Sequence, residues 1–393
     1  MNQDKISFFV YEYGKNCEYS ELIGNISVPL FNEIEKGFIK KGEKSVSLVK
    51  TDDPQKAEFI LFPYYLQGLI TKLDYNGITE YIRKLPYFKE YGTRHIFFRP
   101  DDNYNPLMIN SLVFKQSMDY SDTEPGGIAF PYFVENFRNR LHFNFAEIQN
   151  HTNFIGFIGS SSLRLPVLKS FLANSKLRSE IVVFDRFFYH TDEESKKKHR
   201  ELYLNAIKNS FTTLCPAGTG KNTIRFFETL SFGRIPVLIS DNCALPFEKE
   251  IDYSQIIIRI EEKDARFSSE IVGQWFSSKT ENEIIETCKL ARKTWEEYFY
   301  YENTVWYLLE ELLRIKNNIN LETCKTVKNF VPVDYKYRTD ELKKQAQEFM
   351  EKNDMLSALN CLITANLITG DKANVRKLVE MKNSLMLAEL GKA

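Results

Sequence analysis

The sequence predicts an α/β protein built from two doubly wound parallel sheets. Its 393 residues exceed the usual size of a single hydrophobic core, so two domains are expected. Short runs of apolar, β-branched and aromatic residues recur between turn-forming residues, and strands that are apolar on both faces belong to parallel sheets covered by helices. The segments between these runs are long enough for the crossover helices that parallel strands require.

The predicted strands fall into two sets, which we assign to domains at residues 1–148 and 149–320. Ligands of such sheets bind at the carboxyl ends of the strands, and two domains of this kind that face each other make a cleft. The first set consists of residues 6–13, 45–49, 57–65, 94–100 and 126–133, and the second of residues 153–160, 180–185, 211–216, 235–240 and 256–261.

The chain after residue 262 is predicted to be helical. Residues 281–318 repeat apolar positions at steps of three and four, which predicts one long helix or two that clamp the domains. Residues 335–393 are expected to form a helical extension of about three amphipathic helices, with Gly370 and Asp371 at a turn. This extension is either a packing appendage or a module that binds a partner protein.

Composition excludes several classes of protein. Hydrophobic residues make up 43% of the chain and aromatic residues 14%, which excludes intrinsic disorder. The 52 basic and 53 acidic side chains nearly cancel, so no overall field attracts nucleic acid or an anionic membrane. The six cysteines form no CxxC pair and no cluster with histidines, so neither a zinc site nor a disulfide framework is expected.

A glycine-rich loop lies within residues 211–230, FTTLCPAGTGKNTIRFFETL, which are predicted to form a strand, a loop and a helix. Gly218 and Gly220 let the backbone approach a ligand closely and adopt positive φ angles. Asn222 or Thr223 caps the helix, whose first amide groups and positive dipole end favour an anion. The loop therefore predicts an anion site.

Charged residues around this loop indicate which anion it binds. Lys221 adds a mobile positive charge, and Arg225 offers a planar fork suited to a diphosphate or a carboxylate. Glu228 lies one helical turn after Arg225 and can accept two hydrogen bonds from a ribose diol. The alternative is a surface ion pair between Arg225 and Glu228. Asp241 follows the next strand and either meets sugar hydroxyls or caps a loop.

Two familiar phosphate-binding motifs are absent from the sequence. A P-loop would need glycine in place of Cys215 and serine or threonine in place of Asn222. A dinucleotide fingerprint is missing from the turn after the first predicted strand, which offers only Gly14. The sequence therefore disfavours a nicotinamide or flavin enzyme, including an epimerase.

Residues 210–247 resemble the exostosin-type glycosyltransferases, glycosyltransferase family 47. The family pattern is a Ser-Phe strand ending in a Pro-x-Gly loop, an arginine and a glutamate on the next helix, and then the motifs G-x-I-P-V and D...L-P-F. Weaker similarities upstream extend the resemblance over residues 5–262. The matching residues are Ser210, Phe211, Pro216, Gly218, Arg225, Glu228, Gly233, Ile235, Pro236, Val237, Asp241, Leu245, Pro246 and Phe247.

The resemblance implies a GT-B architecture, in which two Rossmann-like domains face a cleft and the second one holds a nucleotide sugar. It also implies inverting transfer without an obligatory metal, and the sequence has no DxD motif placed for a metal-bridged diphosphate. On this basis Lys221 and Arg225 meet the diphosphate, and Glu228 binds the ribose. The residues expected to bind the nucleotide sugar are Gly159, Ser160, Arg164, Pro216, Gly218, Gly220, Lys221, Asn222, Thr223, Arg225, Glu228 and Asp241.

Direct displacement at a sugar also needs a base that takes the proton of the acceptor hydroxyl, and we expect this base in the first domain. Asp101 and Asp102 follow the predicted strand 94–100, and His95 is the next candidate. Together with Arg225 these are the expected catalytic residues. The alternative is that the two aspartates cap the following turn.

The sequence therefore predicts a hexosyl- or glycuronosyltransferase of polysaccharide synthesis. It would move a sugar, with UDP as the expected carrier, to a glycan or lipid-linked glycan acceptor, without cofactor, metal or nucleic acid. No apolar run is long enough for a membrane span, so we expect a cytoplasmic protein that contacts the inner membrane face or a partner protein through its C-terminal helices. The alternative is a non-catalytic sugar- or nucleotide-binding or scaffold protein with the same fold.

Overall fold

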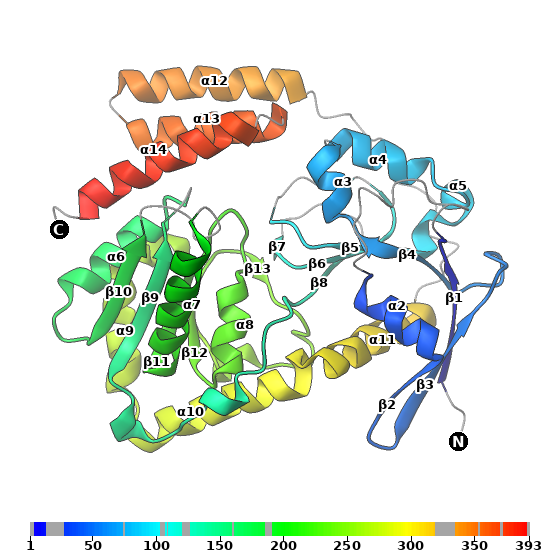
Figure 1. The fold of residues 1–393 in the computed structure, drawn as a ribbon, viewed down its shortest axis with the longest axis horizontal. Coiled ribbons are helices and arrows are strands. Elements are labelled where there is room, and N and C mark those ends of the chain that lie inside the picture. Colours follow the sequence, from blue (N-terminus) through cyan, green and yellow to red (C-terminus); the bar gives the residue numbers. More distant parts are fainter. Residues whose placement is uncertain are drawn as a thin grey trace. The chain divides into compact units, whose positions relative to one another are not determined.

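The computed structural model describes most of the chain as two compact units (Figure 1). Unit 1 comprises Met1–Tyr132, Asn242–Phe247 and Glu297–Val331, and unit 2 comprises Phe133–Asp241, Glu248–Glu296 and Pro332–Ala393. The described residues are 4–12, 27–73, 75–102, 107, 109–119, 126–158, 161–184, 191–318, 335–352, 354–369 and 372–390.

Unit 1 contains a seven-stranded sheet with the order β2-β3-β1-β4-β5-β6-β8. Neighbouring strands pair in parallel except β2 and β3, which pair antiparallel. The five residues of β5, HIFFR, are all buried, as expected for a strand covered on both faces. The strands are β1 (Asp4–Val10), β2 (Phe38–Lys41), β3 (Lys44–Lys50), β4 (Phe59–Tyr65), β5 (His95–Arg99), β6 (Leu112–Lys115) and β8 (Gly127–Ala129).

Unit 1 also contains several helices. A short antiparallel pair, β7 (Met118–Asp119) with β13 (Cys243–Ala244), joins the returning segment to the same unit. The helices are α2 (Pro29–Lys36), α3 (Gln67–Lys72), α4 (Tyr75–Arg83), α5 (Phe88–Tyr91) and α11 (Tyr301–Asn318).

Unit 2 contains a five-stranded parallel sheet with the order β10-β9-β11-β12-β14. Its core joins apolar residues of the strands to those of α6, α9 and α10. The strands are β9 (Asn150–Phe157), β10 (Ser179–Phe184), β11 (Ser210–Pro216), β12 (Ile235–Ile239) and β14 (Ile258–Ile260), and the helices are α6 (Arg164–Ala173), α7 (Glu193–Lys208), α8 (Ile224–Ser231), α9 (Ser268–Ser277) and α10 (Glu281–Thr294). The expectation of an α/β protein with parallel sheets is confirmed.

The helical extension folds as α12 (Tyr335–Glu351), α13 (Met355–Thr369) and α14 (Lys372–Leu390). It belongs to unit 2, because α14 packs against α6 and Met386 lies in the core of that unit. The predicted turn at Gly370 and Asp371 lies outside the described residues. In the part of the chain that is described, no helix combines the length and apolar character that crossing a membrane requires.

The division of the chain differs from the domain boundaries expected at residues 148 and 320. Residues 133–148 belong to unit 2, whereas residues 297–318 belong to unit 1. The continuous helical pattern of 281–318 is in fact interrupted by a π-helical turn, Trp295–Phe299, between α10 and α11. The unit boundary falls inside this turn, where the apolar spacing of the sequence shows no break.

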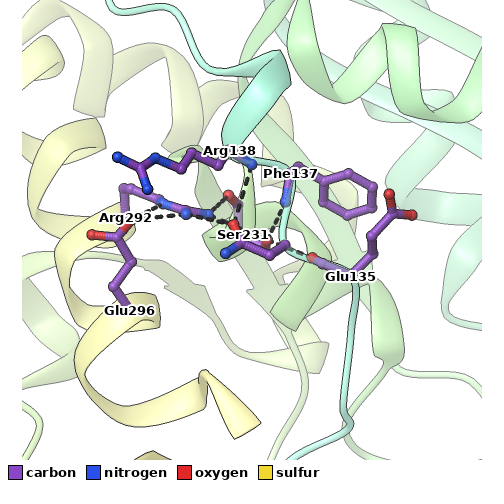
Figure 2. Close-up of polar contacts among 7 residues, drawn as sticks. Glu135, Phe137, Arg138, Ser231, Arg292 and Glu296 are labelled. Carbon is purple, nitrogen blue, oxygen red and sulfur yellow. Dashed lines mark hydrogen bonds and ion pairs between the residues drawn. The ribbon is translucent and has the colours of Figure 1, made fainter.

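A buried arginine explains why residues 133–148 pack in unit 2 (Figure 2). The Arg292 side chain of α10 is 5% exposed, and it donates hydrogen bonds to the Ser231 carbonyl and to Asn136 Oδ1, the latter at 2.7 Å. The Ser231 hydroxyl donates to the Glu135 carbonyl at 2.7 Å and accepts from the Phe137 amide at 3.3 Å. This network joins α10, the end of α8 and residues 135–137.

A second buried arginine extends this attachment. Arg234 is fully buried and donates to the carbonyls of Gly233, His142 and Lys208 at 3.0, 3.1 and 2.9 Å. Buried carbonyls without a donor cost about 1–3 kcal/mol each, so both arginines stabilise the segment substantially.

We expect Arg292→Met to lower the free energy of unfolding by about 2–3 kcal/mol, because it leaves the buried Ser231 carbonyl without this donor and removes the bond to Asn136, while keeping an apolar stem. Urea unfolding measures the change. The matched control is Lys289→Met on the same helix, whose half-exposed ammonium pairs only with Glu286 among the described side chains and should change stability by less than about 0.5 kcal/mol. Equal effects of the two variants would contradict this account.

The burial of His95 makes the free energy of unfolding depend on pH. It is fully buried, and its Nδ1 donates to the Tyr91 carbonyl at 2.8 Å. Burial lowers the pKa of His95 to about 4, so the folded protein holds it neutral while the unfolded chain protonates it below about pH 6.5.

A group that binds a proton only in the unfolded chain lowers the free energy of unfolding as the pH falls. Between pH 7 and pH 5 the wild-type protein should lose about 2 kcal/mol through His95, and His95→Gln should lack this part of the loss. Urea midpoints of both proteins at the two pH values measure the difference. Parallel pH profiles would show that His95 does not act in this way.

Candidate functional site

The candidate site lies in unit 2, at the carboxyl ends of its parallel strands. Loops after β9, β11, β12 and β14 emerge there, and open α/β sheets bind ligands at this edge. The structure brings the predicted residues Arg164, Gly218, Lys221 and Asp241 to these loops. Gly159 and Ser160 lie outside the described residues.

The loops after β9 and β11 are joined to each other. The Ser161 hydroxyl donates to the Ala217 carbonyl at 2.7 Å, and Arg164 donates to the carbonyls of Phe157 and Ile158 at 2.8 and 3.2 Å. The Arg164 guanidinium lies against the Cα atom of Gly218, because a Cβ atom there would be 2.6 Å from Arg164 Nη2. Glycine at position 218 therefore permits the close approach of Arg164, but its φ angle is not positive as expected.

Arg225 bridges β9 and β11. Its Nη2 donates to the Ile155 carbonyl at 2.9 Å and its Nη1 to the Leu214 carbonyl at 3.3 Å. The guanidinium also lies 4.3 Å from the centre of the Phe154 ring, a cation–π distance. Glycine at position 156 leaves room for this guanidinium, since a Cβ atom would come within 2.7 Å of Arg225 Nη2 and the arginine would have to shift.

Lys221 and Asp241 meet at Glu262, which is not among the residues predicted from the sequence. Lys221 Nζ lies 2.8 Å from Glu262 Oε1, which also accepts from the Asp241 amide at 3.0 Å. The Glu262 amide in turn donates to Asp241 Oδ1 at 2.9 Å. Glu262 follows β14, so its position just after a predicted strand is the signal that could have identified it.

Glu228 is buried, with 2% exposure, and it contacts α7. Arg200 Nη1 lies 2.7 Å from Glu228 Oε1, and the Tyr203 hydroxyl donates to Oε2. Burial and the neighbouring carboxylate raise the pKa of Tyr203, which keeps this donor protonated. The alternative of a surface ion pair between Arg225 and Glu228 is therefore wrong, because Glu228 pairs with Arg200 in the interior.

The remaining predicted loop residues support the start of α8. Pro216 is the last residue of β11, and the Gly218 amide donates to the Gly220 carbonyl at 3.1 Å. Thr223 occupies the N-cap position of α8. Asn222 is buried, and its Oδ1 accepts from the Thr223 amide at 2.8 Å.

In unit 1, the two candidate aspartates differ in environment. Arg99 and Asp101 form a buried bidentate pair, with Nε–Oδ2 and Nη2–Oδ1 distances of 2.6 and 3.0 Å. Asp102 is exposed, and its Oδ1 accepts from the Tyr132 hydroxyl at 2.6 Å. Burial and Asp102 raise the pKa of Tyr132, so this hydroxyl stays a donor. The turn that the aspartates were expected to cap, residues 103–106, lies outside the described residues.

His95 lies apart from the two aspartates. It is the first residue of β5, whereas Asp101 and Asp102 follow the other end of that strand. Its ring packs between Phe88 and Phe97, and its Nε2 lies 2.8 Å from the Tyr11 hydroxyl. These contacts and its burial place His95 in the core of unit 1, away from the two aspartates.

Metal ligands do not gather in the described part of the chain. Among those residues, no group of three or more His, Cys, Asp or Glu side chains is placed to hold a metal ion.

Comparison with known proteins gives a consistent result. The family model for the Exostosin GT47 domain matches residues 9–274. An exostosin-1 homolog of Caenorhabditis elegans is 31% identical over 143 residues, which cover 35% of this chain and 35% of that protein. Exostosin-1 of Drosophila melanogaster is 31% identical over 123 residues, which cover 31% of this chain and 16% of that protein.

A plant protein matches over a longer segment. The probable glucuronoxylan glucuronosyltransferase IRX7 of Arabidopsis thaliana is 20% identical over 251 residues, which cover 55% of each chain. The matches thus span between about a sixth and about half of the length of these relatives.

We expect Gly156→Ala to lower the free energy of unfolding by about 1–3 kcal/mol, because the added methyl group displaces Arg225 from the carbonyls that it bonds to. Urea unfolding measures this without a ligand. The control is Gly273→Ala in α9, where the nearest atom would be 3.8 Å away and the better helix propensity of alanine should leave stability equal or higher. A Gly156→Ala protein as stable as the wild type would contradict the placement of Arg225.

Proposed function

This chain belongs to the exostosin GT47 family, and from this premise we propose that it is an inverting glycosyltransferase. It transfers a hexosyl or glycuronosyl group from a nucleotide sugar, with UDP as the carrier, to a glycan acceptor during polysaccharide synthesis. The observation that supports this proposal most strongly is the set of cationic side chains, Arg164, Lys221 and Arg225, at the loops and strand ends of unit 2.

We propose that each of these residues has a separate role in the donor site. Arg164 and Lys221 contact the diphosphate, and Lys221 exchanges its bond to Glu262 for a phosphate oxygen. Arg225 stabilises the negative charge that builds up on the leaving group, and electrostatic stabilisation of this kind is usually the largest catalytic term. Asp241 meets hydroxyls of the donor sugar.

Glu228 is proposed to bind the ribose. A carboxylate has about four acceptor positions, and Arg200 and Tyr203 take two of them. Arg200 also offsets the negative charge that Glu228 would otherwise bring beside a diphosphate. This pairing makes a carboxylate compatible with an anion site, which the sequence alone does not explain.

Asp102 is the proposed catalytic base. It is exposed and held by Tyr132, whereas both oxygens of Asp101 are bonded to buried Arg99. In a direct displacement, Asp102 takes the proton of the acceptor hydroxyl, the acceptor oxygen bonds to the anomeric carbon, and the bond from that carbon to the diphosphate breaks. The nucleoside diphosphate leaves with the electron pair.

The remaining parts of the proposal rest on the resemblance to the family. We propose a GT-B arrangement of the two sheet-containing units, transfer without a metal or another cofactor, and a lipid-linked or free glycan as acceptor. We further propose a cytoplasmic location with peripheral contact at the inner membrane face.

Substitution of each aspartate tests the assignment of the base in a screen of nucleotide sugars and glycan acceptors. Asp102→Asn should lower kcat/KM by about 100-fold or more and leave stability unchanged, since the residue is exposed. Asp101→Asn should instead lower the free energy of unfolding by about 3 kcal/mol, because it leaves the fully buried Arg99 charge without its carboxylate. Asp53→Asn, at a half-exposed surface pair, is the control for both measurements.

Full turnover by Asp102→Asn would reject Asp102 as the base. A wild-type protein that binds a nucleoside diphosphate but turns over no nucleotide sugar would favour the alternative, a non-catalytic sugar- or nucleotide-binding protein with the same fold.

A further inference from the structure

The lysine of the glycine-rich loop is bonded to a carboxylate from a different loop of unit 2. Lys221 follows β11, and its Nζ lies 2.8 Å from Oε1 of Glu262, which follows β14. The two side chains are 18% and 31% exposed, so the pair is partly shielded from water. Less water screens a pair in such a place than a pair on the open surface. The Glu262 carboxylate therefore takes the position on Lys221 that an anionic ligand would need.

Glu262 is held in this position by Asp241, which follows β12. The Asp241 amide donates to Glu262 Oε1 at 3.0 Å, and the Glu262 amide donates to Asp241 Oδ1 at 2.9 Å. Neither of these bonds involves Lys221, so both can persist when Lys221 turns to another anion. The Glu262 carboxylate then stays beside the glycine-rich loop and can bind Lys221 again.

A carboxylate and a phosphate compete for the same ammonium group. A diphosphate carries more negative charge than a carboxylate, so it can displace Glu262 from Lys221, whereas an uncharged ligand gains nothing from the exchange. Part of the attraction between Lys221 and the diphosphate is offset by the lost bond to Glu262, which weakens binding. When a nucleoside diphosphate leaves, the bond between Lys221 and Glu262 forms again and favours its departure.

We propose that Glu262 is a positioning residue that competes with the donor diphosphate for Lys221 and thereby speeds the release of the nucleoside diphosphate product. The inference rests on the proposed function, in which Lys221 contacts the diphosphate. Product release limits the turnover of many enzymes, so a built-in competitor for the diphosphate serves turnover at the expense of affinity.

Calorimetry with UDP, inorganic pyrophosphate and uridine tests this inference. Glu262→Gln removes the charge but keeps an oxygen that can accept from the Asp241 amide. It should bind UDP and pyrophosphate about fivefold more tightly than the wild type and uridine equally well, and stopped-flow measurements should show that UDP dissociates about fivefold more slowly.

The matched control is Glu261→Gln, which makes the same change of charge one residue earlier. Glu261 is exposed and pairs with Lys263. In about 0.15 M salt, which screens exposed charges, this variant should bind all three ligands as the wild type does.

A second substitution separates competition for Lys221 from a general loss of negative charge beside the ligand. In a Lys221→Met background, Glu262→Gln should change UDP binding by less than about twofold, because the group for which the two anions compete is gone. A fivefold gain that persists in this background would reject the competition.

The outcomes separate the two proposals. If the wild-type protein binds neither UDP nor another nucleoside diphosphate, the proposed function fails. If the wild-type protein binds UDP and Glu262→Gln binds it equally well or more weakly, only the role of Glu262 is rejected.

Carbon-13 NMR of the glutamate carboxyl groups tests the inference in the wild-type protein. Saturating pyrophosphate should shift the signal of Glu262, because its carboxylate loses Lys221, whereas the signal of Glu261 should stay in place. An unmoved Glu262 signal would overturn the inference even if Glu262→Gln did not fold.

Discussion

Two arginines bond to backbone carbonyls near the carboxyl ends of β9 and β11, and the candidate site depends on these bonds. Arg164 bonds to Phe157 and Ile158, and Arg225 joins Ile155 to Leu214. Each bond removes the cost of an unsatisfied carbonyl and also fixes a positive charge at the edge where parallel sheets bind ligands. The same bonds therefore stabilise the fold and hold the two positive charges at the proposed donor site.

The sequence predicts those features that local pattern determines. Each strand expected from its apolar residues is present, whereas β2 and β6 are not predicted because they are four residues long and end in lysine. The pattern of residues 211–230 correctly predicts a strand, a loop and a helix, and hence which residues lie close to the loop after β11. His95 does not lie beside Asp101 and Asp102, because the start and the end of one strand lie at opposite ends of the sheet.

Partners that are distant in sequence could not be predicted. Arg200 and Tyr203 reach Glu228 from α7, Glu262 reaches Lys221 from the end of β14, and Tyr132 holds Asp102. Each contact is set by the packing of separate elements, and no spacing in the chain encodes it. Charged residues on a polar helix also resemble ordinary surface residues until the tertiary structure shows which of them are buried.

The division of the chain into units has a consequence for biosynthesis. Unit 1 begins at the N-terminus, but it receives residues 242–247 only after four of the five strands of the unit 2 sheet have been synthesised, and residues 297–318 only after the whole sheet. Nascent chains grow at about 5–20 residues per second, so the first sheet waits for roughly 10–40 seconds before its last segment has been synthesised. During that interval its apolar surface is available to chaperones, and no single cut in the chain yields two complete units for separate expression.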